Sequence, residues 1–536
     1  MPAYAYRRQP FVRPPELDGR GGETPVAIVG AGPVGLALAV DLATRGVASV
    51  VLDDNDVVSV GSRAICWAKR TLEIFDRLGL GERMLAKGVT WRVGRLFHGA
   101  EEVYAFDLLP EAGHKYPAFV NLQQYYVEEW LVERARDFPD LIDLRFLNAV
   151  TAHEDLGDRV RLGVSTPQGA YALEARWMVA CDGAGSPTRR RMGLDFEGQT
   201  FEEQFLIADV EMADGPFAGG TPERWFWFDP PFHGGKSALL HRQPDDIYRI
   251  DLQLDAGADG RAEAAPERVI PRIRAMVGDR PFRLDWTSVY RFRCARLDRF
   301  VHGRVIFCGD SAHVVSPFGA RGGNGGVQDA DNLGWKLAAA LGGAAPEALI
   351  ETYHDERAHA ADENIRHSTR ATNFMTPKSP VEALFRAEAL RLAHEQPFAR
   401  RLINSGRLST PCSLEGFALQ TPGAAPVAPG GPAVDAPLDG GAWLLPLVQG
   451  AFTLAGFGAV DLPEVAGVRR VGVAQTGRWP CHGDATGLAR ARYGDGLAYL
   501  FRPDGHVAAV FARPSATAVE AAMRRALGRD PAREAA

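Results

Sequence analysis

The chain has 536 residues, which is more than a single hydrophobic core can organise, so we expect two or three domains. Its 46% hydrophobic and 24% charged residues are ordinary for a globular protein, and a net charge of −7 argues against a nucleic-acid-binding function. Six cysteines without paired spacing predict neither a disulfide framework nor a metal site. No apolar run is long enough to cross a membrane, so we expect no membrane partner and a cytoplasmic protein.

Residues 1–23 carry no regular pattern and are expected to form a tail that is either loose or docked. The apolar run Val26–Val29 then predicts a buried strand, followed by Gly30-Ala-Gly32-Pro33-Val-Gly35 and a helix. In such a motif the first glycine permits a tight turn, the second lets the backbone approach a pyrophosphate, and the third lets the helix pack on the strand. Asp53 follows the next strand, where a carboxylate can accept ribose hydroxyls. The motif therefore predicts dinucleotide binding; the alternative is a turn next to an ordinary strand-terminal acid.

Further elements follow in a mixed α/β order. We predict helices over 69–78, 124–136 and 327–341, with helical sequence continuing to about 405. We predict strands over 143–150, 160–165, 171–174, 177–180, 225–228, 237–241, 248–254 and 304–308, and expect residues 203–290 to be strand-rich.

The last hundred residues form a separate unit. A run of Pro, Gly and Ala over 421–440 is typical of a linker. Beyond it, Leu497–Phe501, the turn Pro503-Asp504-Gly505 and Val507–Phe511 predict a β-hairpin, and a final helix is expected over 516–527.

Two more motifs lie far from the first one. They are Cys181-Asp182-Gly183-Ala-Gly185-Ser186 and the run from Val305 to His313, which contains Gly309-Asp310. A glycine-rich block, Gly319-Ala-Arg321-Gly322-Gly323-Asn324-Gly-Gly, follows. Each motif alone is weak, but this order and separation indicate one FAD site.

Together these motifs resemble those of the group A flavoprotein monooxygenases, which are single-component, FAD-dependent aromatic hydroxylases. The resemblance covers about 24–400, and the segments around 225–231, 239–243 and 248–253 look most like the 3-(3-hydroxyphenyl)propionate hydroxylase and phenol hydroxylase branch. It implies an α/β fold with a Rossmann-like FAD-binding domain, an interleaved β-sheet substrate domain and a C-terminal thioredoxin-like domain without a redox cysteine pair. The implied boundaries are 24–98, 121–195 and 291–405 for FAD binding, 99–120 and 196–290 for substrate, 406–440 for a linker and 441–536 for the last domain.

The resemblance also assigns residues to the cofactor. Gly30, Gly32, Pro33, Gly35 and Asp53 would hold the ADP half of FAD, and Arg63 and Gln124 would approach its pyrophosphate and ribityl chain. Asp182 and Gly309 belong to the cofactor motifs, Asp310 would bind a ribityl hydroxyl, and Pro317 would lie beside the isoalloxazine edge. Gly322, Gly323 and Asn324 would offer backbone N–H groups near flavin N1 and O2, ahead of the helix over 327–341.

One position departs from the family pattern. Many members have Gly-Gly-Gln-Gly where this chain has Gly319-Ala-Arg321-Gly322. Arg321 would either add positive charge near the flavin and substrate or project into solvent. Pro317 and Arg321 are the candidates for a catalytic position, and no catalytic triad or metal is expected.

Substrate contacts are expected from the strands over 203–254. The candidates are Trp225, Phe228, His241, Arg249 and Gln253, although each of them could instead belong to the core or to a solvated strand face. Arg249 or Arg242 could hold a substrate carboxylate with two parallel hydrogen bonds. Because Arg249 and Gln253 share one strand face, opposite Tyr248, only one of the two faces can line a pocket.

By resemblance, the reaction is hydroxylation of a small phenolic substrate with NADPH or NADH and O2. Reduced FAD would form a C4a-hydroperoxide, whose distal oxygen attacks the ring. Two alternatives stay open. Flavin-dependent halogenases carry Trp-x-Trp-x-Ile-Pro, and this chain has Trp225-Phe-Trp227-Phe-Asp229-Pro230; a non-catalytic flavin-binding protein is the other. A homodimer is possible.

Overall fold

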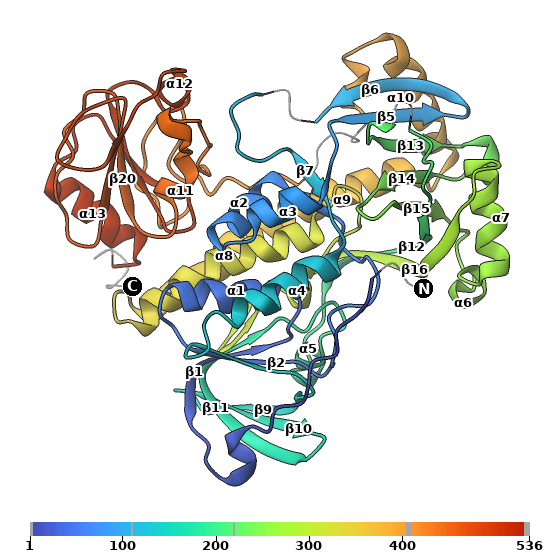
Figure 1. Ribbon diagram of the computed structural model, residues 1–536. Helices are drawn as coiled ribbons and strands as arrows, with labels where there is room; N and C mark the ends of the chain where they lie inside the picture. The colour runs from blue at the N-terminus through green and yellow to red at the C-terminus, as the bar shows by residue number, and fades with distance from the viewer. Residues whose placement is uncertain (1–3, 109–110, 218–219, 404–408, 530–536) are drawn as a thin grey trace.

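The computed structural model describes residues 4–108, 111–217, 220–403 and 409–529 (Figure 1). Its first sheet runs in the order β17-β18-β11-β1-β2-β8, with β10 attached to β11 and β9 attached to β10. The apolar run after the tail forms β1, which lies parallel to β11 and β2 in the middle of this sheet. The strands are β1 Glu23–Val29, β2 Ser49–Leu52, β8 Ile142–Arg145, β9 Ala149–Asp155, β10 Val160–Thr166, β11 Gly169–Ala180, β17 Val301–His302 and β18 Val305–Phe307.

Two predicted strands, 171–174 and 177–180, are in fact the single strand β11. Its first half pairs antiparallel with β10 and its second half parallel with β18. Pairing with partners from distant segments carries the strand through Ala175 and Arg176, where the local sequence suggests a break.

Helices α1 (Pro33–Thr44), α4 (Gln124–Ala135) and α8 (Gly322–Leu341) lie together above this sheet (Figure 1). Helix α8 begins at Gly322, five residues earlier than predicted, in spite of its glycines. Small side chains allow the close approach, since a Cβ at Gly326 would lie 2.6 Å from Val34 Cγ2 and 3.1 Å from Gly309 Cα. Packing against α1 therefore outweighs the low helix propensity of glycine.

The second sheet has the order β19-β16-β12-β15-β14-β13-β5-β6. It contains β5 Val93–His98, β6 Glu101–Asp107, β12 Glu197–Glu211, β13 Arg224–Phe228, β14 Ala238–Arg242, β15 Ile247–Gln253, β16 Arg283–Arg296 and β19 His313–Val314. Because β5 pairs with β6 and β13, the predicted boundary at residue 98 is too late by at least this strand.

A helix covers one face of the second sheet within the region predicted to be strand-rich. It is α7 (Pro266–Val277), preceded by the short α6 (Gly260–Glu263). The signal was present in the sequence: Pro266 at the first helical position, and buried Val269, Ile273 and Val277 at a spacing of four. Helices α9 (Glu351–Met375) and α10 (Pro380–Glu395) lie on the other side of the sheet (Figure 1).

A small sheet and two helices join these parts. Strands β3 (Cys66–Ala68), β7 (Phe119–Asn121) and β4 (Val89–Thr90) pair with one another. Helices α2 (Lys69–Arg77) and α3 (Gly81–Lys87) follow β3, and α2 agrees with the prediction over 69–78.

The C-terminal part is a five-stranded mixed sheet with the order β22-β21-β20-β23-β24. The predicted hairpin is present as β23 (Leu497–Phe501) and β24 (Val507–Phe511), and the predicted last helix as α13 (Ala516–Ala526). The other elements are α11 Leu444–Val448, β20 Thr453–Phe457, β21 Arg469–Val473, β22 Cys481–His482 and α12 Leu488–Tyr493.

The Pro, Gly and Ala-rich segment is not a detached linker. The backbone N–H groups of Thr421, Gly430 and Ala433 donate to the carbonyls of Ala508, Val507 and Gly505. Ala433, Ala436 and Leu438 also belong to the hydrophobic core of the last domain. This segment satisfies its backbone groups on the β23–β24 hairpin, so it is part of that domain.

The tail is docked. Tyr4 is buried and stacks on Tyr125 of α4 with ring centroids 4.1 Å apart. The hydroxyl of Tyr6 accepts a hydrogen bond of 2.8 Å from the backbone N–H of Gly61. Among the described residues, no helix is long and apolar enough to cross a membrane.

Candidate active site

The first glycine motif forms a turn with no room for side chains. Gly30 has a φ of +109°, and a Cβ there would lie 2.5 Å from the carbonyl oxygen of Cys181. A Cβ on Gly35 would overlap the carbonyl oxygen of Gly30. Gly32 is the extended N-cap of α1 and Pro33 its first residue, so the unpaired N–H groups of the first turn face outward from a bare backbone.

Asp53 is fixed beside this turn. Its carboxylate accepts hydrogen bonds from the backbone N–H of Ala31 (2.6 Å) and from that of Asn55 (2.9 Å). The side chain is half-buried, and Oδ1 also accepts from the Asn55 side-chain amide at 2.9 Å, so Oδ2 keeps a free lone pair. The predicted ribose acceptor therefore lies next to the predicted pyrophosphate turn.

The loop over 59–64 is held from both sides. Gln124 accepts from the Ala64 N–H at 2.9 Å and donates to buried Glu128 at 2.7 Å. From the second sheet, Arg249 Nη1 donates to the carbonyl of Ser62 (2.6 Å) and to that of Arg63 (2.9 Å). The Arg63 side chain stays exposed.

Asp182 lies two residues after the end of β11, next to the glycine turn. Its Oδ2 accepts from the N–H of Thr188 at 2.9 Å, while its Oδ1 is buried without a hydrogen bond. Ser186 caps the short helix α5 (Pro187–Arg191) by accepting from the N–H of Arg189. A buried acceptor without a partner is costly unless a ligand or water satisfies it.

Gly309 and Asp310 lie where β18 ends. Gly309 has a φ of +69° and donates its N–H to Asp329 at 3.1 Å. Asp310 keeps exposed surface, but protein atoms surround its inner side, and this burial raises its pKa against the opposing influence of His313. A Cβ on Gly322 would lie 3.8 Å from Asp310 Oδ1, so this carboxyl faces the start of α8.

The segment over 317–324 forms the edge between the two sheets. Pro317 is exposed, and Gly322, Gly323 and Asn324 form the first turn of α8 rather than a loop ahead of it. The Asn324 side chain is hydrogen-bonded to the protein backbone: it accepts from the Ala68 N–H (2.9 Å) and donates to the Cys66 carbonyl (2.8 Å). Only backbone N–H groups of this turn are available to a ligand.

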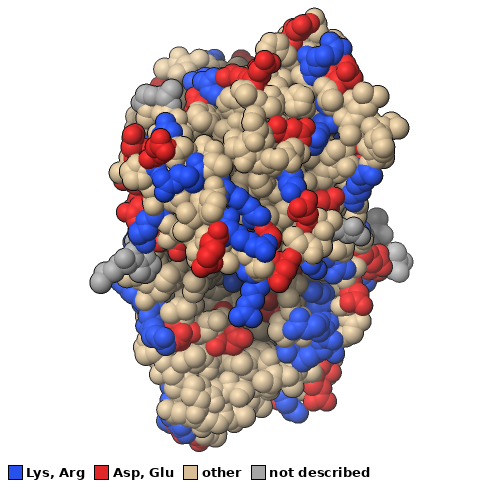
Figure 2. Space-filling view, turned by 90° about the vertical axis from the view of Figure 1, so that its right-hand side faces the viewer, with Lys and Arg blue, Asp and Glu red and all other residues tan. Residues whose placement is uncertain are grey.

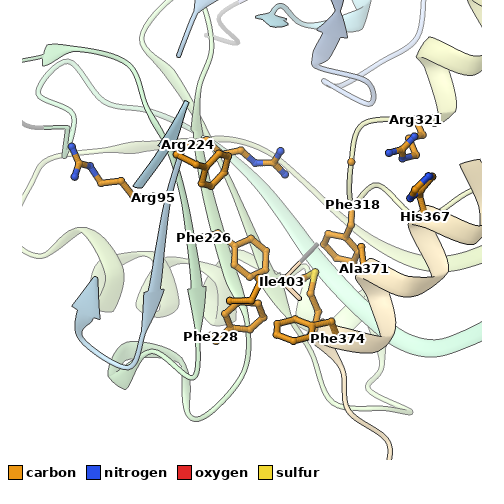
Figure 3. Close-up of a pocket in the computed structure, with 13 residues that line it drawn as sticks. Arg95, Arg224, Phe226, Phe228, Phe318, Arg321, His367, Ala371, Phe374 and Ile403 are labelled. Carbon is orange, nitrogen blue, oxygen red and sulfur yellow. The ribbon is translucent and has the colours of Figure 1, made fainter. Parts of the chain in front are cut away.

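A pocket opens on the other side of this segment (Figure 3). Five phenylalanines line its walls, which come mainly from β13, α9 and the segment just described. The lining residues are Arg95, Phe106, Arg224, Phe226, Phe228, Phe318, Gly319, Arg321, His367, Ala371, Phe374, Met375 and Ile403. Arg321 is buried and donates to Asn364 Oδ1 at 3.0 Å, so it does not project into solvent.

Strand alternation decides which predicted substrate residues reach this pocket. Arg224, Phe226 and Phe228 point into it, whereas Trp225 packs in a hydrophobic cluster under α7. Of the predicted substrate residues on this strand, Phe228 therefore lines the pocket and Trp225 does not. Arg224 and Phe226, which we did not predict, could have been found from the same alternation once one of the three was placed.

The three polar candidates share the pocket-facing side of the sheet but differ in availability. Arg249 donates to Asp251 (2.9 Å) as well as to the 59–64 loop, so its contacts do not support the predicted carboxylate role. Gln253 accepts from the N–H of Ser237 at 2.9 Å. His241 is buried, and burial together with the charges of Arg224 and Arg249 holds its pKa well below the usual range.

The face on which α6 and α7 lie is hollowed, and both basic and acidic side chains lie around the hollow (Figure 2).

Residues 23–368 match the model of a family described as FAD binding domain. The chain belongs to this family, and within it to the group A FAD-dependent aromatic hydroxylases. A flavin-dependent monooxygenase from Mycobacteroides abscessus is 35% identical over 384 residues, which are 67% of this chain and 77% of that protein.

Two further relatives carry more specific names. A 12-dehydrotetracycline 5-monooxygenase/anhydrotetracycline 6-monooxygenase from Streptomyces rimosus is 33% identical, over 67% of this chain and 71% of the relative. A 3-(3-hydroxy-phenyl)propionate/3-hydroxycinnamic acid hydroxylase from Mycolicibacterium gilvum is 31% identical, over 76% of this chain and 70% of the relative. The structure of the flavin-dependent monooxygenase PieE, 22% identical, superposes with a TM-score of 0.80 over 95% of this chain and all of that one, which supports the fold.

The residues present fit FAD, the cofactor of this enzyme. The bare turn at Gly30, Gly32 and Gly35 suits a pyrophosphate, and Asp53 next to it suits a ribose. Asp182 offers a buried oxygen without a partner, and the first turn of α8 offers N–H groups to an electron-rich ring edge. When bound, FAD supplies the redox chemistry that activates O2. The individual assignments stay predictions.

Proposed function

We propose that this enzyme hydroxylates a phenolic aromatic substrate with NADPH or NADH and O2. The observation that carries the proposal is that one segment borders two sites. Residues Phe318, Gly319 and Arg321 line the aromatic pocket, and the next residue begins the helix whose first turn faces Asp310. A ring held in this pocket would lie next to the expected flavin edge.

The pocket supports an aromatic substrate by its composition. Phe226, Phe228 and Phe374 offer faces and edges against which a planar ring can pack, and such contacts are favourable beyond simple area burial. The role of the protein is then to orient the ring, exclude water and accept or stabilise the phenolic proton.

The positions of the halogenase-like motif residues support halogenation less well than hydroxylation. The tryptophans of the halogenase-like motif, Trp225 and Trp227, both pack under α7 and away from the pocket. Asp229, which replaces the expected isoleucine, forms an ion pair with Arg386 at 2.9 Å.

The test is oxidation of NADH and NADPH by the purified holoenzyme, scanned across phenols in the presence of labelled O2. We expect at least one phenol to accelerate oxidation and to gain one labelled oxygen atom by mass. If no phenol is oxygenated, and halide with reduced flavin gives a halogenated ring instead, the proposal is wrong.

A pair of variants ties the reaction to the pocket. Phe374→Ala removes a ring that lines it, whereas Phe398→Ala removes a ring that is 65% exposed. We expect the first to raise KM for the phenol about 10-fold and to divert more of the consumed O2 to peroxide, because the ring is held less well. The second should behave as wild type. Equal behaviour of the two variants would place the substrate elsewhere.

A further inference from the structure

Arg224 on β13 is a pocket-lining cation without a partner in the described part of the chain. No hydrogen bond or ion pair joins its guanidinium to another described residue, and its nearest recorded contact is the ring of Trp91, 5.9 Å from the Arg224 Cζ. Figure 3 shows its side chain reaching across the pocket toward the Phe318 segment.

The other arginines around this site are engaged. Arg95 pairs with Glu223 at 2.6 Å and points away from the pocket (Figure 3), and Arg249 is bound to Asp251 and to the 59–64 loop. Arg321 donates to Asn364. Among the described residues, the guanidinium N–H groups of Arg224 therefore have no hydrogen-bond acceptor, in contrast to those of the other arginines at this pocket.

This position is energetically unusual. Protein atoms surround Arg224, and this burial lowers its pKa, against the opposing charge of nearby Asp251 and together with the like charge of Arg249. Arginine does not give up its proton in proteins, so the cation stays, although no hydrogen bond or ion pair to a described residue satisfies it. A partly buried guanidinium whose hydrogen bonds are unmade is stabilised by a bound anion.

His241 is a second polar side chain next to Arg224. It lies directly opposite Arg224 in the antiparallel pair β13–β14, so the two side chains are on the same side of the sheet. The Nδ1 of His241 is buried without a hydrogen bond, and the imidazole is neutral because its pKa is held low. A neutral imidazole can donate one hydrogen bond to an oxygen that Arg224 also contacts.

Phe226 and Phe228 follow Arg224 on this side of β13, so an apolar wall adjoins the cation. We propose that Arg224 binds a carboxylate of the substrate, so that the enzyme acts on an aromatic acid whose ring packs on Phe226 and Phe228. This inference rests on the proposed function, since it names the class of substrate for that site. An Arg fork matches two carboxylate oxygens, which also sets the direction in which the ring points.

The test measures binding without turnover. The oxidised holoenzyme is titrated with 3-(3-hydroxyphenyl)propionate, with its primary amide and with 3-ethylphenol, and Kd is read from the change in the visible flavin spectrum. Wild type should bind the acid at least about 10-fold more tightly than the amide. Arg224→Gln should weaken binding of the acid by about 10- to 100-fold and leave that of the amide and of the phenol within about threefold, because only the charge-assisted bonds are lost.

Two further variants serve as controls for the binding measurement. Arg224→Lys keeps the charge without the fork and should retain part of the preference for the acid. Arg92→Gln removes a guanidinium that is paired with Asp107 and 72% exposed, and it should bind all three compounds as wild type does. If Arg224→Gln does not fold, the acid-to-amide ratio of wild type and of Arg224→Lys decides.

Three outcomes would overturn the proposal: no preference of wild type for the acid, an unchanged preference in Arg224→Gln, or equal loss for the acid and the phenol, which would assign the contact to a phenolate. Failure of the proposed function is distinguishable. If the acid binds through Arg224 but gains no oxygen in the presence of NAD(P)H, the binding site stands and the hydroxylation does not.

Discussion

Arg502 of the C-terminal hairpin turn and Glu356 of α9 form a fully buried ion pair with two bonds, Nη1 to Oε1 at 2.6 Å and Nη2 to Oε2 at 2.9 Å. Lys336 of α8 donates to the same carboxylate at 2.8 Å, and Asp504 accepts from Trp335 at 3.1 Å. Burial alone would raise the pKa of Glu356, but the charges of Arg502 and Lys336 hold it well below the usual range. Arg502 and Asp504 thus connect the last domain to α9 and to α8, the helix whose first turn faces the expected cofactor site.

We expect Glu356→Gln to destabilise the enzyme, because buried Lys336 would lose its ion-pair partner and Arg502 would keep only Asp504 as a buried counter-charge. Removing one partner of such a group costs about 3–5 kcal/mol. The thermal midpoint of the holoenzyme checks this. Glu464→Gln, at an 85% exposed side chain paired with Arg470, should change it by less than about 1 kcal/mol in equivalent free energy. Equal midpoints for the two variants would mean that the buried pair does not hold the domain.

The glycine turn gives a second prediction. Gly30→Ala should greatly reduce FAD content, since the new Cβ would meet the Cys181 carbonyl and the φ of +109° is strained for alanine. Gly22→Ala is the matched control, because a Cβ there has no neighbour within 4 Å. FAD per protein chain after gel filtration is the readout, and retention of a full complement by Gly30→Ala would contradict the assignment of this turn.

The docked tail gives a third prediction, since Tyr6 holds the N–H of Gly61 two residues before Arg63. Tyr6→Phe removes this acceptor and should weaken FAD binding several-fold, at about 0.5–1.5 kcal/mol for one hydrogen bond. Tyr126→Phe removes a comparable hydroxyl, which donates to Asp245 at 2.6 Å on the surface. This control variant should bind FAD as tightly as wild type. Reconstitution of apoprotein with FAD measures both affinities, and indistinguishable values would show that the tail is irrelevant to the loop.

Asp209 gives a pH-dependent prediction. Burial raises its pKa to about 7, against the opposing charge of Arg249 and a hydrogen bond from Ser62. A carboxyl that binds its proton more tightly when folded stabilises less as pH rises, so stability should fall between about pH 4 and 7 and then level off.

Asp209→Asn removes this titration and keeps an amide of the same shape next to Ser62. The variant should lose less stability than wild type between pH 5 and 8, and its thermal midpoint at pH 8 should be higher by a few degrees. Parallel pH profiles of wild type and Asp209→Asn would exclude Asp209 as the titrating group.

The sequence by itself determined the features whose demands are local. Only glycine satisfies the backbone at Gly30 and Gly35, a strand ends before Asp53, and an Asp-Gly turn connects β23 to β24. Sterics within a few residues set these features, so their spacing was sufficient to predict the family and the cofactor.

Only the tertiary structure decided which side chains are available at the pocket. Arg249 and Arg224 both lie on strands and on the same side of the sheet, yet Arg249 is bound to the carbonyls of Ser62 and Arg63 while Arg224 has no such partner among the described residues. Likewise, α8 starts at Gly322 because α1 packs against it, and the segment before the last domain is ordered because the β23–β24 hairpin bonds it. In each case the partner comes from a distant part of the chain, and local propensity carries no information about it.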